Sequence, residues 1–548
     1  MSYIIGMDFG TLSGRAIVVN ADNGDEVGTA VMDYPSGVID RELAGKRLPP
    51  DFALQDAQDY LDVLVHCIPG AVKDAGIDPS EIKGIGLDHT SATVMVTTED
   101  GTPLNQLEEF KDNPHAWTKL WKHHGGQDQA DRIVELAKKR DEDWLARYGG
   151  VLSSEMLMPK ALETLEKAPE VYAAAKHIVN ALDWIPWQLT GNLVYAEGDS
   201  GYKRQWQDGA YPSKEYLEEL NPGFTGAFSE KMPAEIGPLG KSVGTLTQEW
   251  ADKLGLSTDV AVAVGNIDAH VTATAVQAVE PGQLTGILGT SVCWVVSGED
   301  YKEVPGTFGI VQGGIVPGYW GFEGGQTAVG DIFAWFVENC VPASYQAEAE
   351  EQGIGLHELL TNKAKDQQVG EHGLIALDWH NGNRSILADS NLSGMILGQT
   401  LATRAEDQYR AIMEACVFGA RVIIENFEEH GVEITEIVGA GGLLKNEFLM
   451  QLYADITRRP ISTATSGQAP ALGAAIYGAV AAGLYPDVFA ASKAMGGKEE
   501  AKYTPDEERA QRYDALYAEY KKLHDYFGQG GNEVMHTLKE IRRKATEN

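Results

Sequence analysis

The chain contains two copies of one short pattern, in which a Gly-Thr turn with a nearby serine joins two apolar runs. Residues 7–19 read MDFGTLSGRAIVV, and residues 287–296 read ILGTSVCWVV. Glycine lets the backbone approach an anion closely, while main-chain N–H groups and hydroxyls donate hydrogen bonds to phosphate oxygens. A single such turn is more often an ordinary hairpin. Two copies, one in each half of the chain, predict two related lobes that each contribute to a phosphate site.

The apolar pattern around these turns predicts an α/β fold. Helical and strand patterns alternate after the first strands, which is typical of a sheet covered by helices. The expected early elements are an antiparallel meander of three strands (3–8, 15–20 and 26–34), a helix (54–74) and a buried strand (84–88). A buried strand near residue 260 is predicted to open the second lobe. The predicted domains are an N-terminal lobe (1–264), a C-terminal lobe (265–485) and a charged helical extension (486–548) that packs on the body or on another subunit.

The charge balance excludes several classes of partner. Asp and Glu number 80 against 44 Lys and Arg, a formal net charge of -36, which opposes sequence-independent binding to nucleic acid or anionic lipid. The four cysteines form no CxxC pair, and no run approaches the roughly 18 apolar residues of a membrane span. We therefore expect a cytoplasmic protein that acts on small molecules, with no nucleic-acid or membrane partner. A homo-oligomer is left open.

Asp268 is the candidate general base. It lies in VGNIDAH (264–270), at the end of the buried strand near residue 260, where polar side chains project into a cleft. A carboxylate there can accept a proton from a substrate hydroxyl during phosphoryl transfer. Two other interpretations are open at this point: Asp268 caps a helix, or Asp268 and His270 ligate a metal ion.

Two further segments carry binding candidates. EIVGAGGLLKN (436–446) combines a strand, a glycine-rich turn and the start of a helix, a junction where the backbone can press against a nucleotide. The alternative is a close helix-on-strand turn. Glu323 precedes two glycines at a strand end and is a candidate for holding sugar hydroxyls, with a solvated loop residue as the alternative.

Together these segments resemble the FGGY family of carbohydrate kinases, within the actin-like ATPase superfamily, over nearly the whole chain. MDFGTLSGRAIVV is similar to the family's first phosphate motif, GTSVCWVV to its second, and GAGGLLKNEFLMQLYADITRRPI to its adenosine motif. GMILGQTLATRAEDQYRAIMEA resembles the C-terminal signature, and APALGAAIYGA the closing helix. The resemblance implies two actin-like lobes of the ribonuclease H type, with a cleft between them that closes over a sugar, ATP and Mg²⁺.

The resemblance also implies roles for single residues. Asp8 falls where the family holds Mg²⁺ beside the ATP phosphates, and Asp268 falls on the catalytic base. Two positions depart from the family pattern: Leu12 replaces a second hydroxyl residue in the first turn, and Ala334 replaces a frequent glutamine. The residues that the resemblance places against the nucleotide are Thr11, Ser13, Arg15, Gly289, Thr290, Gly330, Gly441, Gly442 and Asn446.

The predicted sugar pocket departs from that of glycerol kinase. Ser91 and Ala92 stand where that enzyme has an Arg-Glu pair for the polyol, so glycerol is not the expected acceptor. EGDSGYKRQW (197–206) brings Lys203 to the pocket, where an ammonium donates to sugar oxygens. Small Ala92 leaves room for a longer substrate. The predicted sugar-binding residues are Ser91, Ala92, Lys203, Asp268 and Glu323.

The expected reaction is the ATP-dependent phosphorylation of a ketopentose, L-ribulose to L-ribulose 5-phosphate, a step of L-arabinose catabolism. One alternative is another kinase of the family, acting on D-ribulose, xylulose or a pentitol. A second alternative is an actin-like ATPase that hydrolyses ATP without a sugar acceptor. That class needs a peptide-binding or polymerising surface, and the sequence shows no separate peptide-binding domain.

Overall fold

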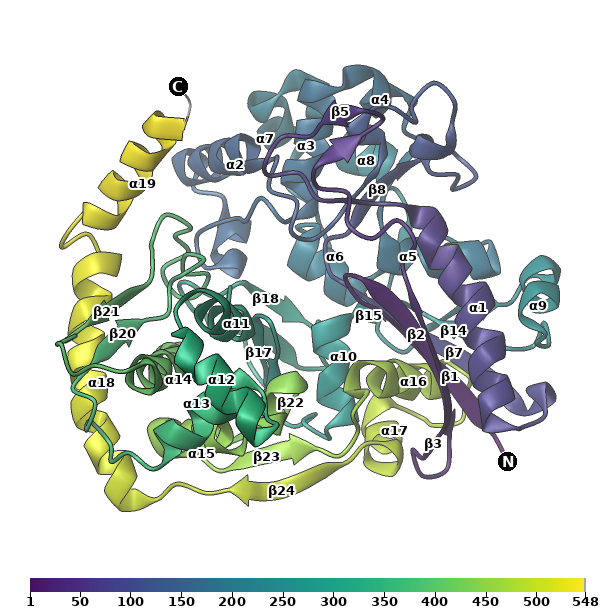
Figure 1. The fold of residues 1–548 in the computed structure, drawn as a ribbon. Helices are drawn as coiled ribbons and strands as arrows, with labels where there is room; N and C mark the ends of the chain where they lie inside the picture. The colour runs from purple at the N-terminus through teal and green to yellow at the C-terminus, as the bar shows by residue number, and fades with distance from the viewer. Residues whose placement is uncertain (547–548) are drawn as a thin grey trace.

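The computed structural model describes residues 1–546, which contain two seven-stranded mixed sheets, one in each half of the chain (Figure 1). The strands of the first sheet lie in the order β13-β14-β7-β1-β2-β3, with β15 paired to β7. They are β1 (Tyr3–Phe9), β2 (Ser13–Asn20), β3 (Glu26–Asp33), β7 (Ile82–His89), β13 (Ser242–Thr245), β14 (Ala261–Ala263) and β15 (Asn266–Ile267).

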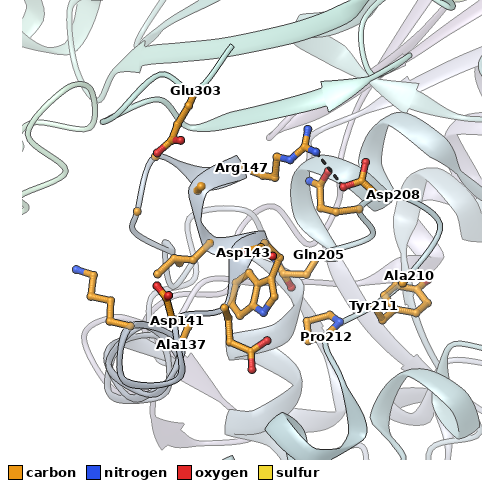
Figure 2. A pocket seen from close by; sticks show the side chains of 18 of the residues that line it. Ala137, Asp141, Asp143, Arg147, Gln205, Asp208, Ala210, Tyr211, Pro212 and Glu303 are labelled. Carbon is orange, nitrogen blue, oxygen red and sulfur yellow. Dashed lines mark hydrogen bonds and ion pairs between the residues drawn. The ribbon is translucent and has the colours of Figure 1, made fainter. Parts of the chain in front are cut away.

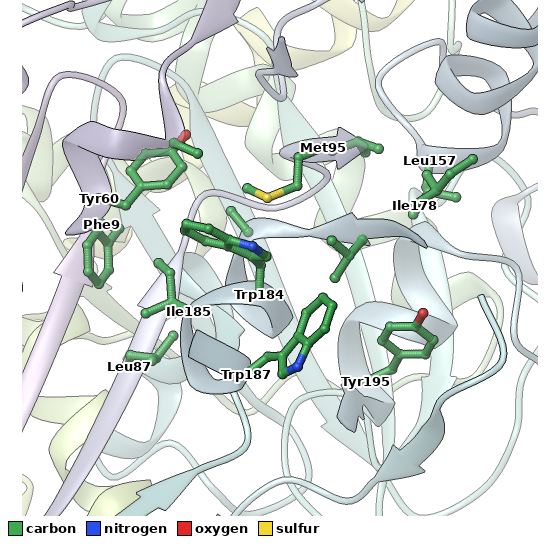
Figure 3. Packing of buried hydrophobic residues seen from close by; sticks show 14 of the residues in the cluster. Phe9, Tyr60, Leu87, Met95, Leu157, Ile178, Trp184, Ile185, Trp187 and Tyr195 are labelled. Atoms are coloured by element: carbon green, nitrogen blue, oxygen red, sulfur yellow. The ribbon is translucent and has the colours of Figure 1, made fainter. Parts of the chain in front are cut away.

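Both faces of the first sheet are covered. β1, β2 and β3 form the predicted antiparallel meander. Side chains alternate between the two faces of a strand: Met7 and Phe9 belong to the core shared with α1 (Ala57–Ala75), while Ile4 belongs to a core on the opposite face. Figure 3 shows the first core, in which the ring of Phe9 lies 6.1 Å from that of Tyr60. Burial on both faces explains the nearly continuous apolar runs of β1 and β2.

The second sheet repeats the central connections of the first. β1 pairs antiparallel with β2 and parallel with β7, and β16 pairs in the same way with β17 and β22. The relation predicted from the two Gly-Thr turns is therefore confirmed. The strands of the second sheet are β18 (Gly309–Gln312), β19 (Trp320–Gln326), β17 (Val292–Gly298), β16 (Gln283–Leu288), β22 (Glu436–Ala440), β23 (Ile461–Ala464) and β24 (Lys498–Tyr503).

The strand near residue 260 corrects one prediction. We expected it to open the second lobe, but β14 and β15 both pair with β7 of the first sheet. The sequence pattern predicted the buried strand correctly but assigned it to the wrong lobe, because strand pairing depends on segments far apart in the chain. The other predicted domain limits stay predictions.

Helix α16 (Ala469–Ala481) also crosses from one half of the chain to the other. It packs on β1 and β7 of the first sheet, although its sequence lies after most of the second sheet. The contact is so close that a Cβ atom on Gly86 would lie 1.8 Å from the carbonyl oxygen of Ala474. Glycines in β1 and β7 therefore allow the helix to approach the sheet.

The C-terminal extension is mainly helical, as predicted, and it also supplies a strand that the prediction omitted. β24 pairs with β23 and forms one edge of the second sheet. α18 then runs along the outside of this lobe (Figure 1), where Tyr513 and Tyr520 are buried against it. The helices of the extension are α17 (Val488–Met495), α18 (Glu507–Gly528) and α19 (Val534–Thr546).

The remaining elements cover the two sheets and form a small four-stranded sheet beside the first one. No helix within residues 1–546 combines the length and the apolarity needed to cross a bilayer. The small sheet consists of β6 (Leu54–Gln55), β8 (Val94–Thr97), β9 (Thr118–Lys119) and β10 (His177–Asn180). The helices that matter below are α3 (Leu157–Lys167), α6 (Glu197–Lys203), α10 (Asp268–Ala275), α11 (Gly330–Asn339), α14 (Ala405–Glu429) and α15 (Glu447–Thr457).

Candidate active site

The carboxyl ends of β1 and β7 place two aspartates side by side. Asp8 and Asp88 are register partners in this parallel pair. Asp88 is fully buried, and neither of its carboxylate oxygens has a hydrogen-bond partner within residues 1–546. On the other side of Asp8, its Oδ2 lies 3.3 Å from Nε of Arg15 on β2. Buried carboxylate oxygens without donors are costly unless a positive charge approaches them.

The ionisation of these acids is coupled through their burial. Burial raises the pKa of Asp8, and the Arg15 guanidinium opposes that rise. Burial also raises the pKa of Asp88 well above its ordinary value, and the carboxyls of Asp8 and Asp268 raise it further. Three acids in one region of low dielectric do not all ionise without a compensating cation. The chemistry of this donor set therefore fits a metal ion.

Asp268 begins helix α10, directly after β15. The N-cap position belongs to Ile267, so the alternative in which Asp268 caps the helix is wrong. The N–H of Ala269 donates to Asp268 Oδ1 at 2.8 Å. Burial, followed by the charge of Asp8, raises the pKa of Asp268 to about 7. A carboxyl group with a pKa near neutrality can both take up and release a proton at pH 7, as a general base must.

An ion-pair cluster lies next to Asp268 and joins α6 and α10 to the second sheet. Lys203, the last residue of α6, places its Nζ 3.2 and 3.3 Å from the two carboxylate oxygens of Glu323 on β19. Nε2 of His270 lies 3.0 Å from Glu323 Oε2. Burial would raise the pKa of Glu323, but Lys203 and His270 outweigh it and lower the pKa to about 2. Glu323 is therefore an ionised acceptor, 5% exposed, at the junction of the lobes.

His270 is thus engaged by Glu323, and this contact weakens the metal-ligand interpretation of the Asp268 and His270 pair. Within the described residues, no group of three or more His, Cys, Asp or Glu side chains is arranged to hold a metal ion. Any ion at Asp8 would need further ligands from outside the protein, such as phosphate oxygens.

The two remaining residues predicted for the sugar pocket, Ser91 and Ala92, follow the end of β7. Ser91 and Ala92 form the turn from β7 to β8, and Ala92 is 1% exposed with a φ of 50°.

The ring of Phe308 lies 4.5 Å from Lys203 Nζ and 5.0 Å from the guanidinium carbon of Arg384. Arg384 was not predicted. It makes a 3.1 Å ion pair with Glu155, which ties the two halves of the chain together near the cluster.

The second Gly-Thr turn is packed against the start of α11. Gly330 N–H donates to Gly289 O at 3.1 Å, and Val329 N–H donates to Thr290 O at 2.9 Å. A Cβ atom on Gly330 would lie 2.8 Å from Gly289 O, so this contact requires glycine. The structure thereby brings Gly289, Thr290 and Gly330 together, as the resemblance implied.

The glycine-rich turn after β22 lies at the same edge of the sheet, because β16 and β22 are adjacent parallel strands. Gly441 has a φ of 106°, and a Cβ atom on it would lie 2.5 Å from Leu288 O. Gly442 begins a short 3₁₀ turn, and Asn446 caps α15 by accepting from Leu449 N–H at 3.0 Å. All six predicted nucleotide residues of this lobe therefore gather at one edge.

The first Gly-Thr turn has an additional partner that the sequence did not indicate. Gly10 N–H donates to Ser13 O at 3.0 Å, which closes the turn. The indole N–H of Trp121 donates to Thr11 Oγ1 at 3.1 Å. The Thr11 hydroxyl keeps its own proton for a further acceptor.

Of the residues that sequence reasoning missed, Asp88 had a usable signal. GIGLD ends in an acid at the carboxyl end of a buried strand, as the segment containing Asp8 does. Trp121 and Arg384 had none, because both lie outside any apolar pattern in irregular segments.

A separate hollow of about 870 Å³ is lined by other residues (Figure 2). It is lined by Trp144 and Tyr211, among others, and by the 2.9 Å ion pair of Arg147 and Asp208. None of the predicted site residues lines it. The candidate active site is instead the cluster of Lys203 and Glu323 beside Asp268.

Comparison with known proteins covers both halves of the chain. Residues 3–275 match the N-terminal domain of the FGGY family of carbohydrate kinases, and residues 284–482 match its C-terminal domain. A ribulokinase from Mycolicibacterium smegmatis is 54% identical over 99% of this chain and 97% of that protein. A ribulokinase from Bacillus licheniformis is 47% identical over 97% of this chain and 98% of that protein.

Solved structures share the fold at lower sequence identity. A ligand-bound xylulose kinase from Lactobacillus acidophilus has a TM-score of 0.78 and 20% identity, covering 96% of this chain and 98% of that one. Plasmodium falciparum glycerol kinase with ADP has a TM-score of 0.72 and 16% identity, covering 95% and 98%. The predicted α/β fold with two actin-like lobes is confirmed. Because its two halves match the two domains of this family, the chain belongs to the FGGY family of carbohydrate kinases.

Proposed function

We propose that this phosphotransferase moves the γ-phosphoryl group of ATP to the terminal hydroxyl of L-ribulose and releases L-ribulose 5-phosphate and ADP. The observation that carries the proposal is the buried Lys203 and Glu323 pair beside Asp268, where an acceptor hydroxyl can be held next to a base. The full-length relatives named ribulokinase support the same acceptor.

In this proposal the sugar is bound by groups of both signs. The ammonium of Lys203 donates to sugar oxygens, and the ionised carboxylate of Glu323 accepts from sugar hydroxyls. Ala92 forms a small, buried wall that leaves room for a five-carbon chain, and Ser91 adds a hydroxyl at the same turn. Because Lys203 and Glu323 already neutralise each other, a neutral polyhydroxy substrate suits the pocket better than an ionic one.

Asp268 is the proposed catalytic base. Its carboxylate accepts the proton of the terminal hydroxyl as that oxygen forms a bond to the γ-phosphorus, and the bond from phosphorus to the β–γ bridging oxygen breaks. The electron pair of that bond leaves with ADP. Little covalent work falls to the protein, so positioning and electrostatics supply most of the rate.

The nucleotide is assigned to the second lobe and its phosphates to both Gly-Thr turns. Gly441, Gly442 and Asn446 would face the adenosine. Main-chain N–H groups and hydroxyls near Thr11 and Thr290 would donate to phosphate oxygens. The proposed phosphate-side residues are Thr11, Ser13, Arg15, Gly289, Thr290 and Gly330.

Mg²⁺ is proposed at Asp8, with Asp88 behind it. The unpartnered oxygens of Asp88 and the raised pKa of both acids are what a cation there would relieve. When bound, Mg²⁺ neutralises phosphate charge. The reaction is placed in L-arabinose catabolism on the strength of the substrate, and in the cytoplasm because ATP is present there and the four cysteines are free.

A panel of sugars in a coupled ADP-release assay tests the proposal. We expect the highest kcat/KM with L-ribulose, lower values with D-ribulose, xylulose and ribitol, and little ADP release without sugar. A clear preference for another sugar would replace the acceptor, and rapid ATP hydrolysis without any sugar would remove the kinase assignment of the site.

A further inference from the structure

The turn that carries Ala92 has an unusual backbone. Ala92 adopts a φ of 50°, in the left-handed region that residues with a Cβ atom rarely occupy, and it is 1% exposed. The turn follows directly on Asp88 and His89 at the end of β7. A strained conformation at a binding site persists only where surrounding groups hold it.

Lys160 of α3 makes one of the contacts that hold this turn, together with a 2.9 Å hydrogen bond between the hydroxyls of Thr90 and Thr93. Its Nζ donates to the carbonyl oxygen of Ala92 at 2.7 Å and to that of Leu120 at 2.7 Å. Leu120 follows β9, so one ammonium group joins α3, the turn after β7 and the end of β9. Lys160 is 0% exposed.

The surroundings of Lys160 leave its charge poorly compensated. The nearest acid on the same helix, Glu163, is engaged by Lys119, whose Nζ lies 2.6 Å from Glu163 Oε2, and by His123 Nε2 at 3.0 Å. Both hydrogen bonds described for Lys160 Nζ end on main-chain carbonyls. Burial accordingly lowers the pKa of Lys160 to about 7, with Glu155 and Glu163 opposing and Lys119 reinforcing that change.

A buried ammonium of this kind costs stability, and an apolar side chain of similar length would avoid the cost. A fixed position of the Ala92 carbonyl in the sugar pocket is a function that would offset this cost. A second lysine of the same cluster, Lys119, donates to Glu163 Oε2, to Thr164 Oγ1 and to the main-chain carbonyl oxygen of Lys160, and it has no described bond to the turn.

We infer that Lys160 is a positioning residue that sets sugar specificity: by holding the carbonyl oxygens of Ala92 and Leu120, it fixes the pocket wall against which the ketose lies. This inference rests on the proposed function, since it takes Ala92 as part of the sugar pocket. Lys160 itself does not touch the substrate. Without it, the turn relaxes from the left-handed conformation and the wall no longer discriminates by size and shape.

Lys160→Met tests the inference, because methionine keeps most of the length and the apolar character of the lysine stem and removes both hydrogen bonds. We expect the KM for L-ribulose to rise about tenfold, and the preference for L-ribulose over D-ribulose and ribitol, measured as the ratio of kcat/KM values, to fall about tenfold. The KM for ATP should stay within about twofold.

Lys119→Met is the matched control, a second buried lysine of the same cluster. It should lower the melting temperature at least as much and leave the sugar preference unchanged. An unchanged preference in Lys160→Met, or an equal loss of preference in Lys119→Met, overturns the inference. If Lys160→Met is insoluble, Lys160→Gln replaces it, because its shorter neutral amide reaches at most one of the two carbonyls and should show the same effect in smaller measure.

The wild-type panel separates this inference from the proposed function. If the wild type prefers a sugar other than L-ribulose, the proposed acceptor fails while the comparison of preferences between wild type and Lys160→Met still stands for the preferred sugar. If the wild type prefers L-ribulose and Lys160→Met keeps that preference, only the inference about Lys160 fails.

Discussion

Carboxylates crowd the junction of the two sheets, where Asp8, Asp88 and Asp268 share one buried region. Asp8 raises the pKa of both Asp88 and Asp268, and Asp268 raises that of Asp88, so protonation of one acid favours ionisation of another. The pKa of Asp268 is raised to about 7, in the range that suits a general base at neutral pH. The pKa of nearby Glu323 is lowered by Lys203 and His270, so Glu323 stays ionised. Carboxyl groups of the same chemical type therefore have different protonation states here, because their surroundings differ.

Asp268→Asn should keep ATP binding and lose about 10²- to 10⁴-fold in kcat, because an amide cannot accept the proton of the sugar hydroxyl. Steady-state ADP release and a nucleotide-binding titration measure the two effects. Asp143→Asn, an exposed aspartate at the hollow in Figure 2, is the matched control and should leave kcat unchanged. Near-normal turnover in Asp268→Asn would remove Asp268 from the role of base.

The pH dependence of the wild type should report the same group. Burial and Asp8 raise the pKa of Asp268 to about 7, so its carboxyl is largely protonated and inactive as a base at pH 6. We expect kcat/KM for L-ribulose to rise about tenfold per pH unit below this pKa and to level off above it. A profile that is flat between pH 5.5 and 7.5 would contradict the assignment.

At the scale of elements, the approach of α16 to the first sheet depends on glycine. The carbonyl oxygen of Ala474 lies where a Cβ atom of residue 86 would stand, at 1.8 Å, and the backbone of a packed helix cannot yield by that much. Gly86→Ala should therefore lower the free energy of unfolding by about 1–3 kcal/mol or more.

Urea unfolding of Gly86→Ala, with Gly467→Ala as the control, tests this packing. Gly467 is exposed, and a Cβ atom there would meet nothing within 4 Å. The control should stay within about 0.5 kcal/mol of the wild type. Equal midpoints for the two variants would show that α16 does not press on the sheet as described.

The elements that were predictable from sequence are those governed by local pattern. The meander and the turn beside Asp8 follow from short apolar runs separated by glycine-containing turns, and the helix start at Asn446 follows from its capping chemistry. The pairing of β15 with β7 was not predictable, because it joins segments far apart in the chain and no local signal specifies a neighbour. Arg384 was missed for a similar reason: only the folded chain brings it to Glu155.

At the scale of the whole molecule, the net charge of -36 opposes compaction. Salt screens this repulsion, with a Debye length that falls from about 30 Å at 0.01 M to about 10 Å at 0.1 M. We expect the melting temperature to rise by several degrees when KCl increases from about 10 to 500 mM, and the rise to shrink at lower pH as carboxylates become protonated. A melting temperature that falls with added KCl would mean that attractive ion pairs, such as Arg384 with Glu155, outweigh the repulsion.

The position of α16 also has a consequence for how the protein is made. The ribosome synthesises β1 and β7 early, but the helix that covers one face of these strands, at residues 469–481, is synthesised much later. At about 5–20 residues per second, the interval between them lasts roughly 20 to 80 seconds. During that time the nascent first lobe exposes apolar surface around Ile4, so a chaperone that shields growing chains should associate with it until translation is nearly complete.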